Sequence, residues 1–172
     1  SSGLAEYELT LQVALKLRDE LTKRGYTVIM VRETHDVDIS NVERAKIANE
    51  AGADAFLRIH ANGSDNQNAK GVLTICQTSK NPYNAEWYKE SKRLSELVLD
   101  EVASSTGAKK RSVWETDTMT GINWAMVPST ILEMGFMTNP EEDEQMATEE
   151  YQDKIVRGTA DAIDLFFSED EQ

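Results

Sequence analysis

The alternation of helix-like and strand-like segments constrains the fold of this chain more than any other feature. Apolar residues at helical spacing predict a helix over residues 6–24. A β-branched segment at 27–31 predicts a strand, and a Ser-x-x-Glu capping box at Ser40 opens a second helix. No linker or internal repeat interrupts this order. The sequence therefore predicts one domain over residues 1–172.

The rest of the chain continues the alternation. Strands are predicted over residues 55–60, 71–77 and 128–135, and helices over 83–105 and 150–167. Such an order is typical of an α/β fold, so we expect a twisted, mostly parallel sheet with helices on both faces. The acidic residues of 168–172 are expected to form a solvated tail.

Charge and composition exclude some partners. The chain has 18 Lys and Arg residues against 31 Asp and Glu residues, a formal charge of −13, which disfavours binding to nucleic acid or to an anionic membrane. No apolar stretch approaches the ~20 residues of a membrane span. Residues 1–4 show neither a basic leader nor an apolar signal segment, so the protein is cytoplasmic or a leader has been removed. The one cysteine, Cys76, is expected to be a buried, inert thiol.

Two ionisable groups end apolar strands. His60 follows the apolar run that begins at Ala55, and Glu133 lies near the end of the segment 128–135. Ligand sites in open α/β sheets gather at the carboxyl ends of strands. His60 is therefore a catalytic or metal-binding candidate, and Glu133 is a general acid/base candidate whose pKa desolvation would raise. The alternatives are a hydrogen-bonded histidine at a strand end, and a glutamate that caps a turn or pairs with a buried arginine.

Other residues are candidates for binding a substrate near this rim. Asn62 follows His60 closely, Arg111 offers a guanidinium that can bind carboxylate, and Asn123 precedes an indole that can stack on a sugar. For Arg111 and Asn123 a surface loop position explains the residue equally well.

Several sequence blocks carry a resemblance to a known family. Residues 36–62, with Ile39-Ser-Asn-Val-Glu-Arg44, Ile47-Ala-Asn49 and Ile59-His-Ala-Asn62, resemble the zinc-dependent N-acetylmuramoyl-L-alanine amidases of the amidase type 3 family. Leu132-Glu-Met-Gly-Phe-Met-Thr-Asn139 resembles the catalytic block of that family, and the helix that begins at Glu6 resembles the segment that holds its glutamate zinc ligand.

The resemblance implies a zinc ion held by Glu6 and His60, with Glu133 as the catalytic acid/base. The implied substrate is peptidoglycan, cut at the amide bond between N-acetylmuramic acid and L-alanine. A monomer that acts outside the cell or in the cell wall is expected.

One part of the family pattern has no match in the chain. Members begin with a strand that ends in an Asp-x-Gly-His-like segment, whose histidine is the third zinc ligand. We therefore expect the first strand of the sheet to be missing and the chain as it stands to be nearly inactive. His35 is an alternative third ligand, although a polar loop explains it as well. A non-catalytic cell-wall-binding or scaffold domain and a zinc peptidase of related mechanism are the alternative functions.

Overall fold

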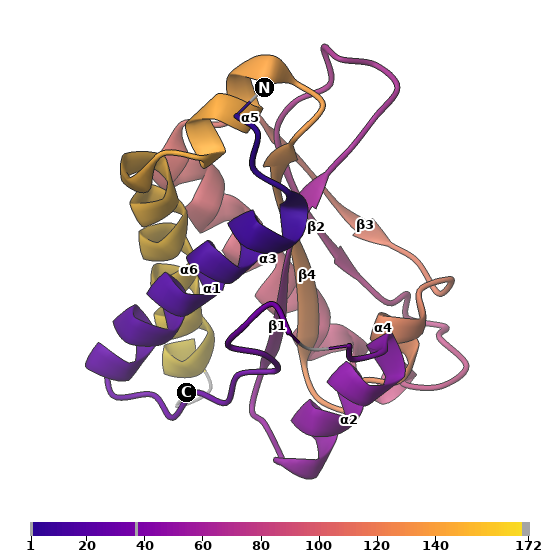
Figure 1. The fold of residues 1–172 in the computed structure, drawn as a ribbon. Helices are drawn as coiled ribbons and strands as arrows, with labels where there is room; N and C mark the ends of the chain where they lie inside the picture. The colour runs from indigo at the N-terminus through magenta and orange to yellow at the C-terminus, as the bar shows by residue number, and fades with distance from the viewer. Residues whose placement is uncertain (1, 37, 170–172) are drawn as a thin grey trace.

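The structure, a computed structural model, describes residues 2–36 and 38–169 (Figure 1). Helices and strands are mixed along it but do not alternate strictly as the sequence predicts, because elements of one kind follow each other at several points. In chain order the elements are α1 (Glu6–Lys23), α2 (Asn41–Glu50), β1 (Phe56–Asn62), β2 (Val72–Cys76), the 3-10 helix η1 (Ala85–Trp87), α3 (Tyr88–Thr106), β3 (Lys110–Glu115), α4 (Thr120–Asn123), β4 (Ser129–Phe136), α5 (Pro140–Met146) and α6 (Glu149–Glu169).

The four strands form one mixed sheet in the order β1-β4-β2-β3. β1 is parallel to β4, and β2 is parallel to β3, whereas β2 and β4 are antiparallel. The expectation of a mostly parallel sheet is confirmed, with the one antiparallel pairing at its centre.

Helices cover both faces of the sheet, as expected (Figure 1). On one face α1, α3 and α6 bury the main core, which includes Leu9, Val98, Leu132, Ile155 and Phe166. On the other face α2 and α4 cover smaller apolar clusters near the amino ends of β1 and β4. The carboxyl ends of those two strands are left free of this second helix layer.

The capping box at the start of α2 is confirmed. Ser40 Oγ accepts a hydrogen bond from the Glu43 amide at 3.2 Å, and the Glu43 carboxylate accepts one from the Ser40 amide at 3.0 Å. These two bonds satisfy donors that a helix start would otherwise leave unpaired. The cap fixes where α2 begins and so where β1 can follow it.

The strand predicted over residues 27–31 is wrong. The segment runs between α1 and α2 without pairing to the sheet, and Ile29 is 59% exposed. A β-branched segment becomes a strand only where a neighbouring strand supplies hydrogen-bond partners. Here a cavity separates it from β1, because both Val28 and Leu57 line the same space.

Three other expectations need correction. β3 was not predicted, because this edge strand is mostly exposed and reads Lys-Arg-Ser-Val-Trp-Glu, without a continuous apolar run. The helix expected from residue 83 begins as η1 and becomes α-helical only at Tyr88. Ser168 belongs to α6 rather than to the expected acidic tail, and residues 170–172 lie outside the described residues.

Candidate metal and catalytic site

The parallel pairing of β1 with β4 places His60 beside Glu133. The register aligns these two residues directly, near the carboxyl ends of both strands. Laterally paired residues in a sheet project from the same face, so the imidazole and the carboxyl group share one rim. The two strand-end residues that the sequence singles out are therefore brought together.

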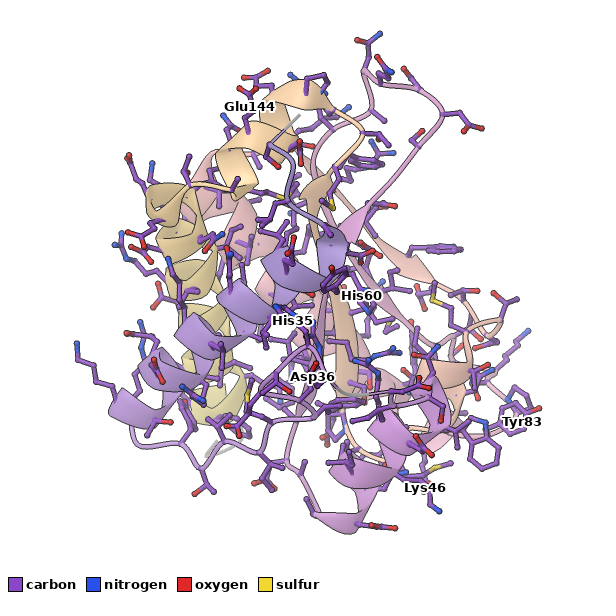
Figure 2. The ribbon with its side chains drawn as sticks, in the orientation of Figure 1. His35, Asp36, Lys46, His60, Tyr83 and Glu144 are labelled. Carbon is purple, nitrogen blue, oxygen red and sulfur yellow. The ribbon has the colours of Figure 1, made fainter. Side chains whose placement is uncertain are left out.

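The first turn of α1 adds a carboxylate to this rim. Glu6 Oε1 lies 3.2 Å from His60 Nδ1 and accepts a hydrogen bond from the Ala61 amide at 3.3 Å. Figure 2 shows His60 next to this first turn. Hydrogen bonding to His60 lowers the pKa of Glu6, against the opposing effect of burial. The structure thus assembles Glu6, His60 and Glu133, which lie far apart in the sequence.

Glu133 is a buried carboxyl group with a free oxygen. Its Oε2 atom is inaccessible to solvent and has no hydrogen-bond partner among residues 2–36 and 38–169. Burial raises the pKa of Glu133 above its usual range, the charge of His60 opposes this rise, and the charge of Glu6 adds to it. A carboxyl group whose pKa moves towards neutrality can both accept and donate a proton at physiological pH. In the part of the chain that the structure describes, no hydrogen bond joins the Glu133 carboxyl group to the turn after β4, so the turn-capping alternative is not supported.

The Glu6–His60 pair fits a zinc ion. Carboxylate oxygen and imidazole nitrogen are common zinc ligands, and two ligands of a tetrahedral ion with bonds of ~2.1 Å lie ~3.4 Å apart. The observed separation of 3.2 Å between Glu6 Oε1 and His60 Nδ1 is close to that value. Among residues 2–36 and 38–169, however, no cluster of three or more His, Cys, Asp and Glu side chains is placed to hold a metal.

His35 does not complete a metal cluster. It lies in the loop before α2 (Figure 2), where its ring packs edge-on against Tyr7 with ring centroids 5.2 Å apart. Its Nδ1 atom lies 3.4 Å from Arg32 Nη1. These contacts support the polar-loop explanation for His35 rather than the substitute-ligand one.

A large cavity lies along the free edge of β1. Its volume is about 1060 Å³, and Glu6 and His60 line it. Its apolar walls come from α1, from the extended segment 27–31 and from β1, and include Leu11, Ala14, Leu17, Leu21, Val28, Met30, Leu57 and Ile59. β1 is an edge strand, so the cavity faces a row of backbone groups without ladder partners in the sheet.

The remaining predicted site residues make local contacts. Asn62 Oδ1 accepts a hydrogen bond from the Gly63 amide at 2.9 Å, and the Arg111 guanidinium lies over the Phe136 ring and donates to the Lys70 carbonyl. Asn123 bonds to Asn81 and to the Asp117 carbonyl, in a network that joins two loops. Their roles in substrate binding stay predictions.

Sequence reasoning missed the basic side chains that share the cavity with His60. Arg32, Arg44 and Arg58 all line it. One signal was present, because Arg58 is a charged residue inside the apolar run of β1, two positions before His60 and on the same face.

A carboxylate–imidazole pair beside a buried glutamate, at the strand ends of an α/β sheet, is typical of metal-assisted hydrolases. The family model described as N-acetylmuramoyl-L-alanine amidase matches residues 1–164, and the chain belongs to this family.

Similarity to individual proteins supports the assignment to this family. The chain is 31% identical over 166 residues to N-acetylmuramoyl-L-alanine amidase LytC of Bacillus subtilis, a match that covers 96% of this chain and 32% of that protein. It therefore spans about a third of LytC. It is 26% identical to the germination-specific N-acetylmuramoyl-L-alanine amidase of the same organism, with coverage of 96% and 72%. The crystal structure of an N-acetylmuramoyl-L-alanine amidase from Clostridium difficile 630 is similar, with a TM-score of 0.88, 28% identity and coverage of 97% and 86%.

Proposed function

We propose that this chain is the catalytic part of a zinc-dependent hydrolase that cleaves the amide bond between N-acetylmuramic acid and L-alanine in peptidoglycan. The observation that carries the proposal is the meeting of Glu6, His60 and Glu133 at one rim of the sheet. The names of the similar amidases support the substrate. We further propose that the protein acts as a monomer outside the cell or in the cell wall. In the described part of the chain, the helices are too short or too polar to cross a membrane.

The residues of the rim have distinct roles in this reaction. Glu6 and His60 would hold the zinc ion, which when bound supplies Lewis-acid polarisation and lowers the pKa of water to about 7. Glu133 takes a proton from the attacking water on its carboxylate and then donates it to the alanine nitrogen as that nitrogen leaves. Burial favours this shuttle, because it raises the pKa of Glu133 and excludes competing hydrogen-bond donors.

We propose that the third protein ligand comes from an extended segment that lies in the cavity beside β1. Three features support such a strand: the free edge of β1, the unpaired β-branched segment 27–31 on the opposite wall, and the apolar lining between them. A strand parallel to β1 in this space would end at the rim that carries His60. It would also supply backbone hydrogen-bond partners to β1 and to segment 27–31.

Zinc titration and muropeptide cleavage test the proposal. In a form of the protein extended by about 30 residues ahead of Ser1, a length of the order of one strand plus a long loop, we expect one zinc per chain and cleavage of muropeptides. The chain of residues 1–172 should bind zinc much more weakly and cleave little, since catalytic zinc ordinarily has three protein ligands. Equal zinc affinity and activity in the two forms would disprove the role of the added strand.

Substitutions separate the metal ligand from the acid/base. In the extended form, Glu133→Gln should keep its zinc and lose roughly 10²–10⁴-fold in turnover, whereas His60→Ala should lose the metal. If Glu133→Gln with bound zinc still turns over normally, the acid/base is another group.

The incomplete ligand set among the described residues favours a second candidate, a non-catalytic cell-wall-binding domain of the same fold. That function predicts pelleting with peptidoglycan sacculi, without zinc dependence and without cleavage in either form of the protein. Cleavage of a stem peptide that carries no N-acetylmuramic acid would instead indicate a zinc peptidase.

A further inference from the structure

Among the residues that the structure describes, three arginines line the cavity beside β1 without an acidic partner. Arg32 donates to the carbonyls of Tyr7 and Thr34 and to the Thr10 hydroxyl. Arg44 donates to the Ile39 carbonyl, and Arg58 donates to Asn41 Oδ1 at 2.7 Å. All of these acceptors are neutral. Within the described ranges, no carboxylate forms an ion pair with any of the three, although the whole chain carries a charge of −13.

These arginines are also close to one another and partly buried. Burial lowers the pKa of both Arg32 and Arg58, and the charge of the nearby Arg44 adds to this effect. The guanidinium of Arg58 lies against the backbone of Gly121, where a Cβ atom would overlap it. A partly buried guanidinium without a counter-charge is destabilising, and an anion bound beside it would offset that cost.

We propose that Arg32, Arg44 and Arg58 form a carboxylate-binding site inside the cavity. A guanidinium offers five N–H donors in a planar fork that matches a carboxylate, and Arg58 uses one side of its fork for Asn41. Arg58 and His60 project from the same face of β1, two residues apart, so a carboxylate bound here lies on the same side of the sheet as the proposed metal site.

Two sources can supply this carboxylate. One is the stem peptide of peptidoglycan, whose D-glutamate follows the alanine next to the cleaved bond; this source rests on the proposed function. The other is an acidic side chain on the protein segment that we place in the cavity. Both present the same group to the arginines, and affinity for small probes distinguishes them.

The test measures the melting temperature of residues 1–172 at pH 7 and constant ionic strength. The probes are L-alanyl-γ-D-glutamate, the same dipeptide with its carboxylates amidated, glutarate and inorganic phosphate. A ligand that binds only the folded state raises the melting temperature with its concentration. We expect the dipeptide to raise it and the amidated dipeptide to leave it unchanged. The variant Arg157→Gln, an exposed arginine of α6, should respond like the unmodified chain.

Arg58→Gln and Arg44→Gln should lose the response to the dipeptide. Arg58→Gln without ligand should melt at the same temperature or higher, because the change removes an unpaired buried charge and leaves an amide that can bond to Asn41. Gly121→Ala provides a second variant, since it displaces the Arg58 guanidinium without changing the charge, and it should also weaken the response.

The outcomes distinguish the two sources of the carboxylate and can disprove the proposed binding site. Binding of the dipeptide at least tenfold tighter than glutarate assigns the carboxylate to the stem peptide, and equal binding assigns it to an acidic side chain of the protein. A response to the amidated dipeptide, a full response in Arg58→Gln, or stronger binding of phosphate would overturn the proposal. His60→Ala should keep the response, so a failure of the zinc mechanism would leave this result unchanged.

Discussion

Cys76 and Glu133 show that burial in one sheet shifts the pKa of a thiol and of a carboxyl group in the same direction, with different consequences. Both side chains lie in central strands, and burial raises the pKa of each. For the thiol the shift moves the reactive thiolate out of the physiological range, with a pKa of about 11. For the carboxyl group a shift in the same direction moves it into the range where proton transfer is useful. Cys76 is thus unreactive, whereas the raised pKa of Glu133 suits the acid/base role that we propose for it.

We predict that Cys76 resists alkylation. At pH 8 a thiol with a pKa near 11 is ionised ~10²-fold less than a free cysteine, and burial adds a steric barrier. Iodoacetamide labelling followed by mass spectrometry should therefore be at least ~10²-fold slower in the folded protein than in denaturant. Rapid labelling of the folded chain would show that β2 opens or that Cys76 is exposed.

Gly158 determines how closely α6 packs on α3. A Cβ atom at this position would lie 2.7 Å from the Glu101 carbonyl oxygen and 2.9 Å from Val102 Cα, both of them backbone atoms that cannot rotate away. Alanine normally favours a helix over glycine by ~1 kcal/mol. Overpacking against a rigid backbone costs ~1–3 kcal/mol, so the steric effect should win.

Gly158→Ala is therefore expected to lower the free energy of unfolding by ~1–2 kcal/mol. Urea denaturation would measure the loss. Arg157→Ala, at the neighbouring exposed position, is the control and should change stability by less than ~0.5 kcal/mol. A more stable Gly158→Ala variant would show that the two helices can separate without cost.

Asp117 connects its own loop to the loop that contains Thr78 and Asn81, and the strength of this connection depends on pH. Its carboxylate accepts hydrogen bonds from the Thr78 amide at 2.9 Å, the Thr78 hydroxyl at 2.6 Å and Asn81 Nδ2 at 2.8 Å. Burial acts to raise the pKa of Asp117, but the hydrogen bonds from Thr78 and Asn81 outweigh it and the pKa is lowered. The stabilisation is thus present above the unfolded pKa of ~3.9 and is lost as the pH falls through the lower folded pKa.

We predict that Asp117→Asn destabilises the protein at pH 7 and has a smaller effect at pH 3. The measurement is the difference in unfolding free energy between the two proteins at each pH. A difference that stays constant or grows on acidification would contradict the lowered pKa.

The helices could largely be predicted from sequence, because caps and helical spacing are local signals. The Ser40 box fixes the start of α2, and the apolar spacing of residues 6–24 gives α1 almost to its ends. Strands depend on their neighbours instead. Segment 27–31 has strand composition but no partner, whereas β3 has a partner but no apolar run.

The candidate site, like the fold, could be predicted from sequence only in part. His60 and Glu133 could be predicted as candidates from their places at strand ends, but their alignment could not, because it depends on the β1–β4 register. Glu6 entered only through the family resemblance, since its contact with His60 depends on how α1 packs across the sheet. The basic cluster was missed because its three arginines come from separate segments.

At the scale of the whole molecule, the two faces of the sheet are unequally packed. The face under α1, α3 and α6 carries the main core, while α2 rests on a small cluster built around Ala45, Ala48 and Phe56. Elements with few buried apolar contacts open at lower free energy than the rest of a fold. The wall of the cavity formed by α2 should therefore be its most easily opened part.

Hydrogen exchange followed by mass spectrometry tests this difference. Backbone amides of α2 should exchange faster than those of α3 and α6 under native conditions. Protection of α2 should increase when a carboxylate occupies the cavity, because Arg44 lies on this helix. Equal protection of α2 and α3 in the free protein would contradict the unequal packing.

The β1–β4 pairing also determines when, during folding, the site comes into being. β1 and β4 are neighbours in the sheet, yet β2, α3 and β3 lie between them in the chain, so their pairing closes a long loop. Pairings of high sequence separation slow folding, because loop-closure entropy is lost before the contacts form. No folding intermediate that lacks this pairing can hold His60 against Glu133. During refolding, the proposed metal and acid/base site should form in one kinetic step with the closure of the sheet, after the helices have formed.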